Sequence, residues 1–132
     1  MRTTRLALVA TNMAAVVAVL TLPGAASATE TQRNVCPTGY FCAYPQTGWQ
    51  GQECKWDVAD PDWTSGIYKC SWAASKPVKS VYNNGTSSAT GVAFYLNKNY
   101  GHRVGCTRKH SGGNLVGDYK VKSHKWISGS CG

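Results

Sequence analysis

The chain has 132 residues with 14 Lys or Arg, 6 Asp or Glu and 6 Cys, and its formal net charge is +8. The length suits a single domain, and a charged fraction of only 15% beside 5 Trp and 7 Tyr excludes the disordered and coiled-coil classes. An even number of cysteines predicts disulfide bonds in an oxidising compartment.

The first residues have the pattern of a secretion signal. Arg2 and Arg5 precede an apolar run over residues 6–20, and Ala26-Ser27-Ala28 offers small side chains for cleavage after Ala28. The apolar run is too short to span a bilayer, which weighs against a membrane anchor. The sequence therefore predicts a secreted, extracellular protein with a signal peptide over 1–28, a flexible arm over 29–35 and a domain over 36–132.

Short stretches of β-branched and aromatic residues alternate with Gly, Asn, Ser and Pro through the rest of the chain. No helical period is sustained, and regularly spaced short strands favour an all-β sandwich or barrel. Asn83-Asn84-Gly85 is a hairpin-type turn signal, because Asn and Gly tolerate a positive φ. The expected strands are Tyr40–Tyr44, Val78–Tyr82, Gly91–Leu96, Leu115–Val121 and Trp126–Ser128.

The chain contains an internal repeat. Four landmarks recur at a nearly constant offset, so that Tyr44, Trp49, Cys54 and Ser80 of the first half correspond to Tyr95, Tyr100, Cys106 and Ser128 of the second. Repeats of this length are typical of two supersecondary modules packed as a pair. Two Greek keys of four strands fit the number of residues.

The segment from Tyr44 to Gly51, with an aromatic residue, four others, Trp49, one more and a glycine, resembles the hairpin signature of βγ-crystallin Greek keys. The opening Cys36-Pro-Thr-Gly-Tyr-Phe-Cys42 is similar to the start of the Streptomyces metalloproteinase inhibitor family. The resemblance implies an all-β, βγ-crystallin-like sandwich of two disulfide-stapled Greek-key modules, over about 36–85 and 86–132. It also implies a secreted proteinase inhibitor and not an enzyme.

Several residue roles follow from this resemblance. The family points to a disulfide between Cys36 and Cys42, and the repeat then suggests the pairs Cys54–Cys70 and Cys106–Cys131. The hairpin aromatics, which pack across their turns in βγ-crystallins, correspond to Tyr44 with Trp49 and to Tyr95 with Tyr100. In the second hairpin Gly101 comes one residue early, and His102 stands where the family has glycine.

The resemblance also places an inhibitory loop at Cys106, Thr107 and Arg108, with Cys106–Thr107 as the bond offered to the proteinase. A rigid, substrate-like loop binds tightly because it loses little entropy on binding. Against a metalloproteinase, a loop carbonyl would approach the zinc ion. The chain departs from the family here, because no second cysteine follows closely after Cys106.

Neither a metal nor a cofactor is expected. Residues Ser75–Ser80 and 124–129 match the calcium motif of βγ-crystallins, but Lys76 and Lys125 occupy positions that need oxygen ligands. The cysteines lack the spacing of a zinc site, and the three histidines show no close pairing.

Two other classes of function are weighed against inhibition. Ten of the 14 Lys and Arg residues lie from Lys69 onward. A patch of Arg108, Lys109, Lys120, Lys122 and Lys125 suggests an antimicrobial, killer-toxin-like or cell-surface-binding protein that contacts an anionic wall or membrane. A glycosidase would need two facing carboxylates; the candidates are Glu53, Asp57, Asp60, Asp62 and Asp118. No nucleic-acid-binding signature is present, and we expect a monomer.

Overall fold

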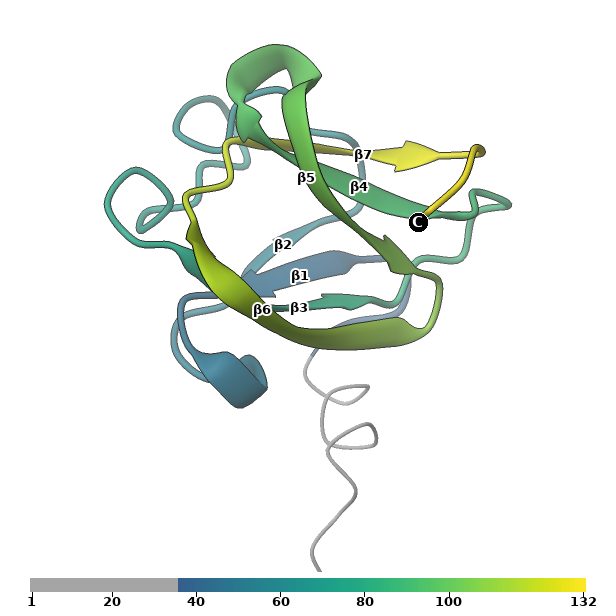
Figure 1. The fold of residues 1–132 in the computed structure, drawn as a ribbon, viewed down its shortest axis with the longest axis horizontal. Coiled ribbons are helices and arrows are strands. Elements are labelled where there is room, and N and C mark those ends of the chain that lie inside the picture. Colours follow the sequence, from purple (N-terminus) through teal and green to yellow (C-terminus); the bar gives the residue numbers. More distant parts are fainter. Residues whose placement is uncertain (1–35) are drawn as a thin grey trace, which may run out of the picture.

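The computed structural model describes residues 36–132, which form two antiparallel β-sheets that pack face to face (Figure 1). The expected signal peptide (1–28) and arm (29–35) lie outside the described residues. The strands are β1 (Phe41–Tyr44), β2 (Cys54–Trp56), β3 (Val78–Asn83), β4 (Gly91–Asn97), β5 (Gly101–Arg108), β6 (Ser111–Tyr119) and β7 (Ser123–Ile127), with 3-10 turns η1 (Thr47–Trp49) and η2 (Lys98–Tyr100).

The two halves of the chain exchange strands between the sheets. One sheet has the order β2-β1-β3-β6, so β6 from the second half pairs with β3 from the first. The other sheet has the order β5-β4-β7, and Asp60 from the first half forms a bridge with His124 at the free edge of β7. This mutual exchange ties the halves together through backbone hydrogen bonds.

The core lies between the sheets and is rich in aromatic rings. Phe41 of β1 stacks on Phe94 of β4, with ring centroids 6.4 Å apart across the two sheets. Trp56 stacks on Trp63 at 4.2 Å. His124 is fully buried beside them, its ring centroid 5.1 Å from that of Phe41. These large side chains bury most of the apolar surface that stabilises a domain of this size.

The strand β1 is buried on both faces, which explains its unbroken apolar pattern. Phe41 and Ala43 face the main core, whereas Cys42 and Tyr44 join a second cluster with Cys36 and Tyr82 on the outer face of the sheet. The loop closed by the Cys36–Cys42 disulfide and the turn η1 cover that face. Alternation is therefore absent because neither side of β1 meets solvent.

The expected and observed strands differ in where some strands begin and in how many strands there are. β1, β3 and β4 agree with expectation to within one residue, but β6 begins at Ser111 and β7 at Ser123, each several residues earlier than expected. The strands β2 and β5 were not expected at all. β5 contains two glycines, two arginines and a histidine at the edge of a sheet, and an edge strand needs no apolar pattern to pair on one side.

The expected hairpin turn at Asn83-Asn84-Gly85 is wrong. β3 and β4, which flank it, belong to different sheets, so the segment crosses between sheets and does not reverse a hairpin. The Asn83 side chain stabilises the crossing, because its Oδ1 accepts a hydrogen bond from the Gly85 N–H at 2.9 Å. Asn84 is buried, and its Nδ2 donates to the Cys36 carbonyl at 2.8 Å.

All six cysteines are paired. The disulfides join Cys36 to Cys42, Cys54 to Cys70 and Cys106 to Cys131, which are the pairs that the family and the repeat suggested. Within residues 36–132, no helix is both long and apolar enough to cross a membrane.

Candidate inhibitory segment

The expected inhibitory residues Cys106, Thr107 and Arg108 lie on a strand and not on a protruding loop. They form the end of β5, where they pair with Ala93, Val92 and Gly91 of β4. β5 is the edge strand of its sheet, so only one of its sides is paired within that sheet. The loop was expected from the family resemblance alone, and an edge strand needs no apolar pattern that would have indicated it in the sequence.

One disulfide and one side-chain hydrogen bond fix this segment. Cys106 is bonded to Cys131 near the C-terminus, and the Thr107 carbonyl accepts a hydrogen bond from the Asn83 side chain at 2.9 Å. Thr107 is only 8% exposed, whereas Arg108 is exposed beside it. Asn83 is a supporting residue that sequence reasoning missed, because the Asn-Asn-Gly signal was assigned to a local turn.

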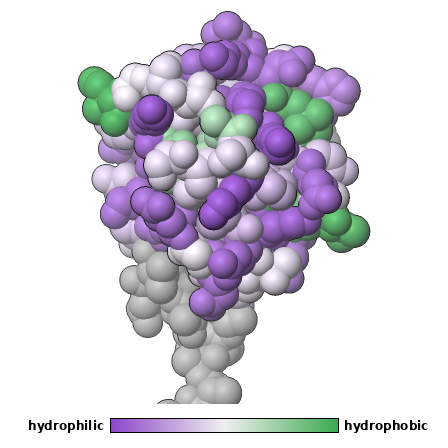
Figure 2. Space-filling view, turned by 90° about the vertical axis from the view of Figure 1, so that its left-hand side faces the viewer, coloured by the Kyte–Doolittle hydropathy of each residue, from purple (hydrophilic) through white to green (hydrophobic). Residues whose placement is uncertain are grey.

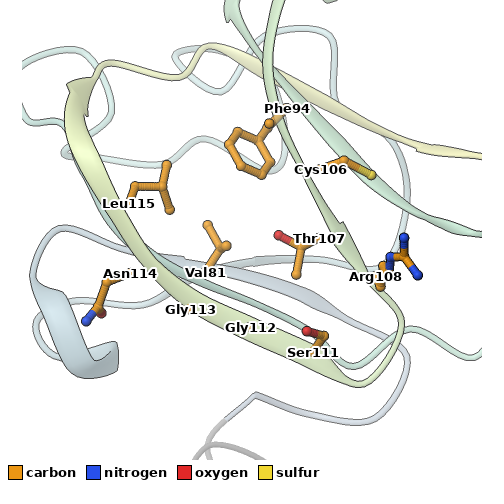
Figure 3. A pocket seen from close by; sticks show the side chains of 11 residues that line it. Val81, Phe94, Cys106, Thr107, Arg108, Ser111, Gly112, Gly113, Asn114 and Leu115 are labelled. Atoms are coloured by element: carbon orange, nitrogen blue, oxygen red, sulfur yellow. The ribbon is translucent and has the colours of Figure 1, made fainter. Parts of the chain in front are cut away.

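A groove of about 370 Å³ runs between the open edge of β5 and β6 (Figure 3). Val81, Phe94 and Leu115 contribute apolar side chains to it, and Arg108 stands at its rim (Figure 3). β6 lines the groove with Gly112 and Gly113; a Cβ at Gly113 would meet no atom within 4 Å, whereas one at Gly112 would lie 2.5 Å from the Val81 carbonyl oxygen of β3. The groove thus separates two strand edges that belong to different sheets.

The repeated hairpins form two equivalent turns. Gly48 and Trp49 of η1 have φ of 65° and 59°, and Asn99 and Tyr100 of η2 have 57° and 63°. The left-handed conformation therefore recurs at the positions that the repeat relates. His102 also has a positive φ of 58°, as does its counterpart Gly51 at 90°, although histidine adopts this conformation less readily.

The aromatic residues of these turns pack as corners. Tyr95 and Tyr100 meet edge to face with centroids 5.8 Å apart, and burial is the main cause that raises the pKa of Tyr100. Trp49 packs against the outer cluster that contains Tyr44, and it meets Tyr82 edge to face at 6.4 Å. The first corner therefore has a third aromatic member that the repeat did not indicate.

The repeat predicts Ser128 as the counterpart of Ser80, and this prediction is wrong. The structural counterpart of Ser80 is Ser123 and not Ser128, because Ser80 Oγ accepts from the Trp49 N–H and Ser123 Oγ from the Tyr100 N–H. The stretch equivalent to 75–80 is accordingly 118–123. It contains Asp118, Lys120 and Lys122, and the first contains Lys76 and Lys79, so lysines outnumber acidic residues in both stretches.

The expected basic patch is divided in two. Arg108 ends β5 and Lys109 follows it, both just before the start of β6, whereas Lys120 and Lys122 follow the end of β6. The ends of β6, Ser111 and Tyr119, pair with Asn83 and Val78 at the two ends of β3, so at about 3.3 Å per residue of β3 these ends are roughly 17 Å apart. The structure does not bring these four cations together.

Two of the lysines have local structural partners. Lys122 Nζ donates to the Ala73 carbonyl at 2.8 Å, and burial lowers its pKa, with Lys120 and Lys98 acting in the same direction. Lys125 Nζ lies 4.8 Å from the ring centroid of Tyr100, in cation–π geometry. Both cations therefore support the fold.

Three of the acidic residues are likewise engaged by neighbours. Asp118 forms an ion pair with Lys79, and Asp62 with Lys98 at 3.3 Å. Asp60 is buried and accepts a hydrogen bond from Trp56 Nε1 at 3.0 Å. Within residues 36–132, no group of three or more His, Cys, Asp or Glu side chains is arranged to hold a metal ion.

These features define a small, disulfide-bonded, two-sheet β-protein with an anchored edge segment. The model of peptidase inhibitor family I36 matches residues 29–107, more than half of the chain. The chain therefore belongs to peptidase inhibitor family I36, the Streptomyces metalloproteinase inhibitor family, as its resemblance indicated. No curated protein matches the chain.

Proposed function

We propose that the chain is a secreted inhibitor of an extracellular metalloproteinase and acts through Cys106, Thr107 and Arg108 of β5. Membership of a peptidase inhibitor family supports a proteinase as the partner. The observation that carries the choice of segment is its double anchorage: the disulfide to Cys131 precedes the Cys106–Thr107 bond, and the hydrogen bond from Asn83 follows it.

This anchorage suits a substrate-like inhibitor. Proteinases bind substrates as extended chains, and β5 is an extended strand with a free edge. Because the segment is already ordered, it loses little conformational entropy on binding. If the Cys106–Thr107 bond were cut, the disulfide and the pairing with β4 would hold both new ends in place, so the bond could re-form and the complex would persist.

In this proposal the Cys106 carbonyl approaches the zinc ion of the target, and exposed Arg108 contacts the cleft beyond it. The inhibitor itself is a monomer without catalytic activity or cofactor. We further propose that its domain, 36–132, consists of two Greek-key modules, about 36–85 and 86–132. The equivalent turns η1 and η2 and the exchange of strands between the sheets support this assignment.

The test is an inhibition assay with the secreted chain against metallo-, serine and cysteine proteinases. We expect dose-dependent inhibition of a thermolysin-type metalloproteinase, weakened about tenfold by Arg108→Asp, because one good contact is worth about 1.4 kcal/mol. Lys120→Asp makes the same charge change at an exposed site at the far end of β6 and serves as the control.

Prolonged incubation supplies a second readout. A cut at the proposed bond adds one water molecule to the intact mass, and subsequent reduction releases a fragment that begins at Thr107. Absence of inhibition across the panel would refute the proposed function. Inhibition with cleavage elsewhere would refute the choice of segment alone.

No observation favours the cell-surface-binding alternative. Its basic residues are divided between the two ends of β6, and Lys122 and Lys125 are engaged within the fold. An electrostatic contact with an anionic polymer gains most when cations gather on one face.

A further inference from the structure

A second exposed segment lies at residues 64–69, between Trp63 and Cys70. Residues 65–69 are all exposed, and Ile67 is 95% exposed. Neighbouring Tyr68 is 44% exposed, and Val58 beside the loop is 49% exposed. A single exposed apolar side chain needs no explanation, but here two are consecutive in the loop and a third, Val58, lines the same hollow.

These side chains stand out against the remaining surface. The face shown in Figure 2 is mainly hydrophilic, and strongly hydrophobic side chains occur on it only in a few separate places. Among the described residues, the only other large apolar side chains with this degree of exposure are Val116 and Tyr119. A shallow hollow of about 290 Å³ also lies against the loop, and Val58, Ile67 and Tyr68 are among its lining residues.

The loop is rigidly closed at its base. The Cys70 N–H donates to the Trp63 carbonyl at 2.7 Å, and the Cys54–Cys70 disulfide fixes the same point to β2. Near the tip, Trp56 Nε1 donates to the Tyr68 carbonyl at 3.1 Å. The exposed residues are thus held by a buried indole and a disulfide.

Asp62 orders the first residues of the loop, which precede its tip. Its carboxylate accepts hydrogen bonds from the Thr64 N–H at 2.9 Å, the Thr64 hydroxyl at 2.6 Å and the Ser65 hydroxyl at 2.7 Å. Gly66 then turns the chain with φ of 81°, immediately before Ile67. The conformation that presents Ile67 is therefore set before any partner binds.

From these observations we propose that the loop 64–69 is a second proteinase-binding site, in which Ile67 enters an apolar specificity pocket. The argument rests on membership of the inhibitor family but not on the β5 segment. A convex, preorganised loop fits the concave cleft of a proteinase. Tyr68 and Val58 would cover the rim of the pocket and exclude water from the contact.

This site is separate from the segment on β5. Asp62 pairs with Lys98 of η2, and the Asn99 N–H donates to the Pro61 carbonyl at 2.8 Å, so the loop lies at the end of the β4–β5 hairpin that contains η2. Arg108 pairs with Gly91 at the opposite end of that hairpin. The strand between the two ends has 8 residues and spans roughly 25 Å.

The experiment measures the affinity of the secreted chain for two proteinases with apolar pockets, a thermolysin-type metalloproteinase and a chymotrypsin-type serine proteinase. We expect Ile67→Asp to weaken binding to at least one of them by about 10- to 100-fold, since the free energy of burying an isoleucine is lost. Ile67→Leu should retain affinity within about threefold, because it keeps the apolar volume.

Val116→Asp is the matched control, since Val116 is 101% exposed on β6 and does not line the hollow beside the loop. The thermal unfolding midpoint should be the same for Ile67→Asp and the parent chain, because Ile67 is almost fully exposed. Unchanged affinity of Ile67→Asp for both enzymes would overturn the inference, as would binding of neither enzyme by the parent chain. Arg108→Asp is measured in parallel: if only this variant weakens binding, the proposed function holds and the second site does not exist.

Discussion

Ser80 and Ser123 make the same pair of hydrogen bonds in the two halves of the protein. Ser80 Oγ accepts from the Trp49 N–H at 2.9 Å and donates to the Gln46 carbonyl at 2.6 Å. Ser123 Oγ accepts from the Tyr100 N–H at 3.1 Å and donates to the Asn97 carbonyl at 2.6 Å. Each buried hydroxyl thus fastens a 3-10 turn to the strand that contains it.

Replacing either serine by alanine should destabilise the fold by about 2 kcal/mol. Each change removes two hydrogen bonds, worth about 1 kcal/mol apiece, and leaves a turn N–H and a carbonyl without their partner. Denaturant unfolding of Ser80→Ala and Ser123→Ala measures the loss. Ser128→Ala is the control, because Ser128 is exposed, and its stability should change by less than about 0.5 kcal/mol. A larger effect at Ser128 than at Ser123 would contradict the structural correspondence.

Gly51→Ala should destabilise the turn that follows η1. Gly51 has φ of 90°, and an added Cβ would lie 2.8 Å from Pro45 Cγ. The left-handed backbone alone costs about 1–2 kcal/mol for a residue with a side chain, and the contact with Pro45 adds to it. The free energy of unfolding is compared with that of Gly113→Ala, whose Cβ meets no atom within 4 Å. Equal stabilities of the two variants would contradict this account.

Stability should decrease as the pH falls below about 6.5, because His124 is buried in its neutral form. Its Nδ1 accepts from Trp63 Nε1 at 2.8 Å, so its proton resides on Nε2, 3.0 Å from the Val58 carbonyl. Burial lowers the pKa of His124 from 6.5 to about 3. In that interval the unfolded chain binds a proton that the folded chain does not, and the free energy of unfolding falls by about 1.4 kcal/mol per pH unit.

Denaturant unfolding between about pH 7 and about pH 5 measures this slope, and the titration of His124 followed by NMR locates its pKa. The exposed histidines serve as controls, and the slope should persist in a variant that combines His102→Gln with His110→Gln. Loss of the slope in that variant would assign it to the exposed histidines. Asp62 affects stability in a separate pH range. Hydrogen bonds from Thr64 and Ser65 lower its pKa, so the stability that its carboxylate contributes is lost only as the pH falls below about 4.

Removing the Cys54–Cys70 disulfide should destabilise the protein by about 3 kcal/mol, the value expected for a closed loop of this length. The sequence separation is 16 residues, against 6 for Cys36–Cys42. Replacing both cysteines of the shorter pair by alanine should therefore cost about 1 kcal/mol less. Hydrogen exchange should also accelerate over residues 64–69 only when Cys54 and Cys70 are replaced. Equal protection of this loop in both variants would show that its hydrogen bonds suffice to order it.

Sequence reasoning succeeded where a local pattern decides the structure. The positions of β1, β3 and β4 and the all-β class follow from residue type and spacing, whereas the aromatic hairpins were implied by the family resemblance. It failed at β5 and at Asn83, since an edge strand pairs through its backbone and the Asn83 side chain contacts a residue 24 positions away. His102 shows one success and one failure. The repeat indicates a turn at this position, but only the folded chain shows that His102 itself has a positive φ.

Composition and spacing by themselves determined the single small domain, the even set of cysteines and the repeat, because these are properties of the chain alone. The tertiary structure placed Cys106–Thr107 on an edge strand, divided the basic residues between the two ends of β6 and exposed Ile67 on a closed loop. These outcomes depend on which distant segments pair, and no local propensity encodes that choice. Within residues 36–132, the cations of the expected basic patch thus form separate groups and not one face.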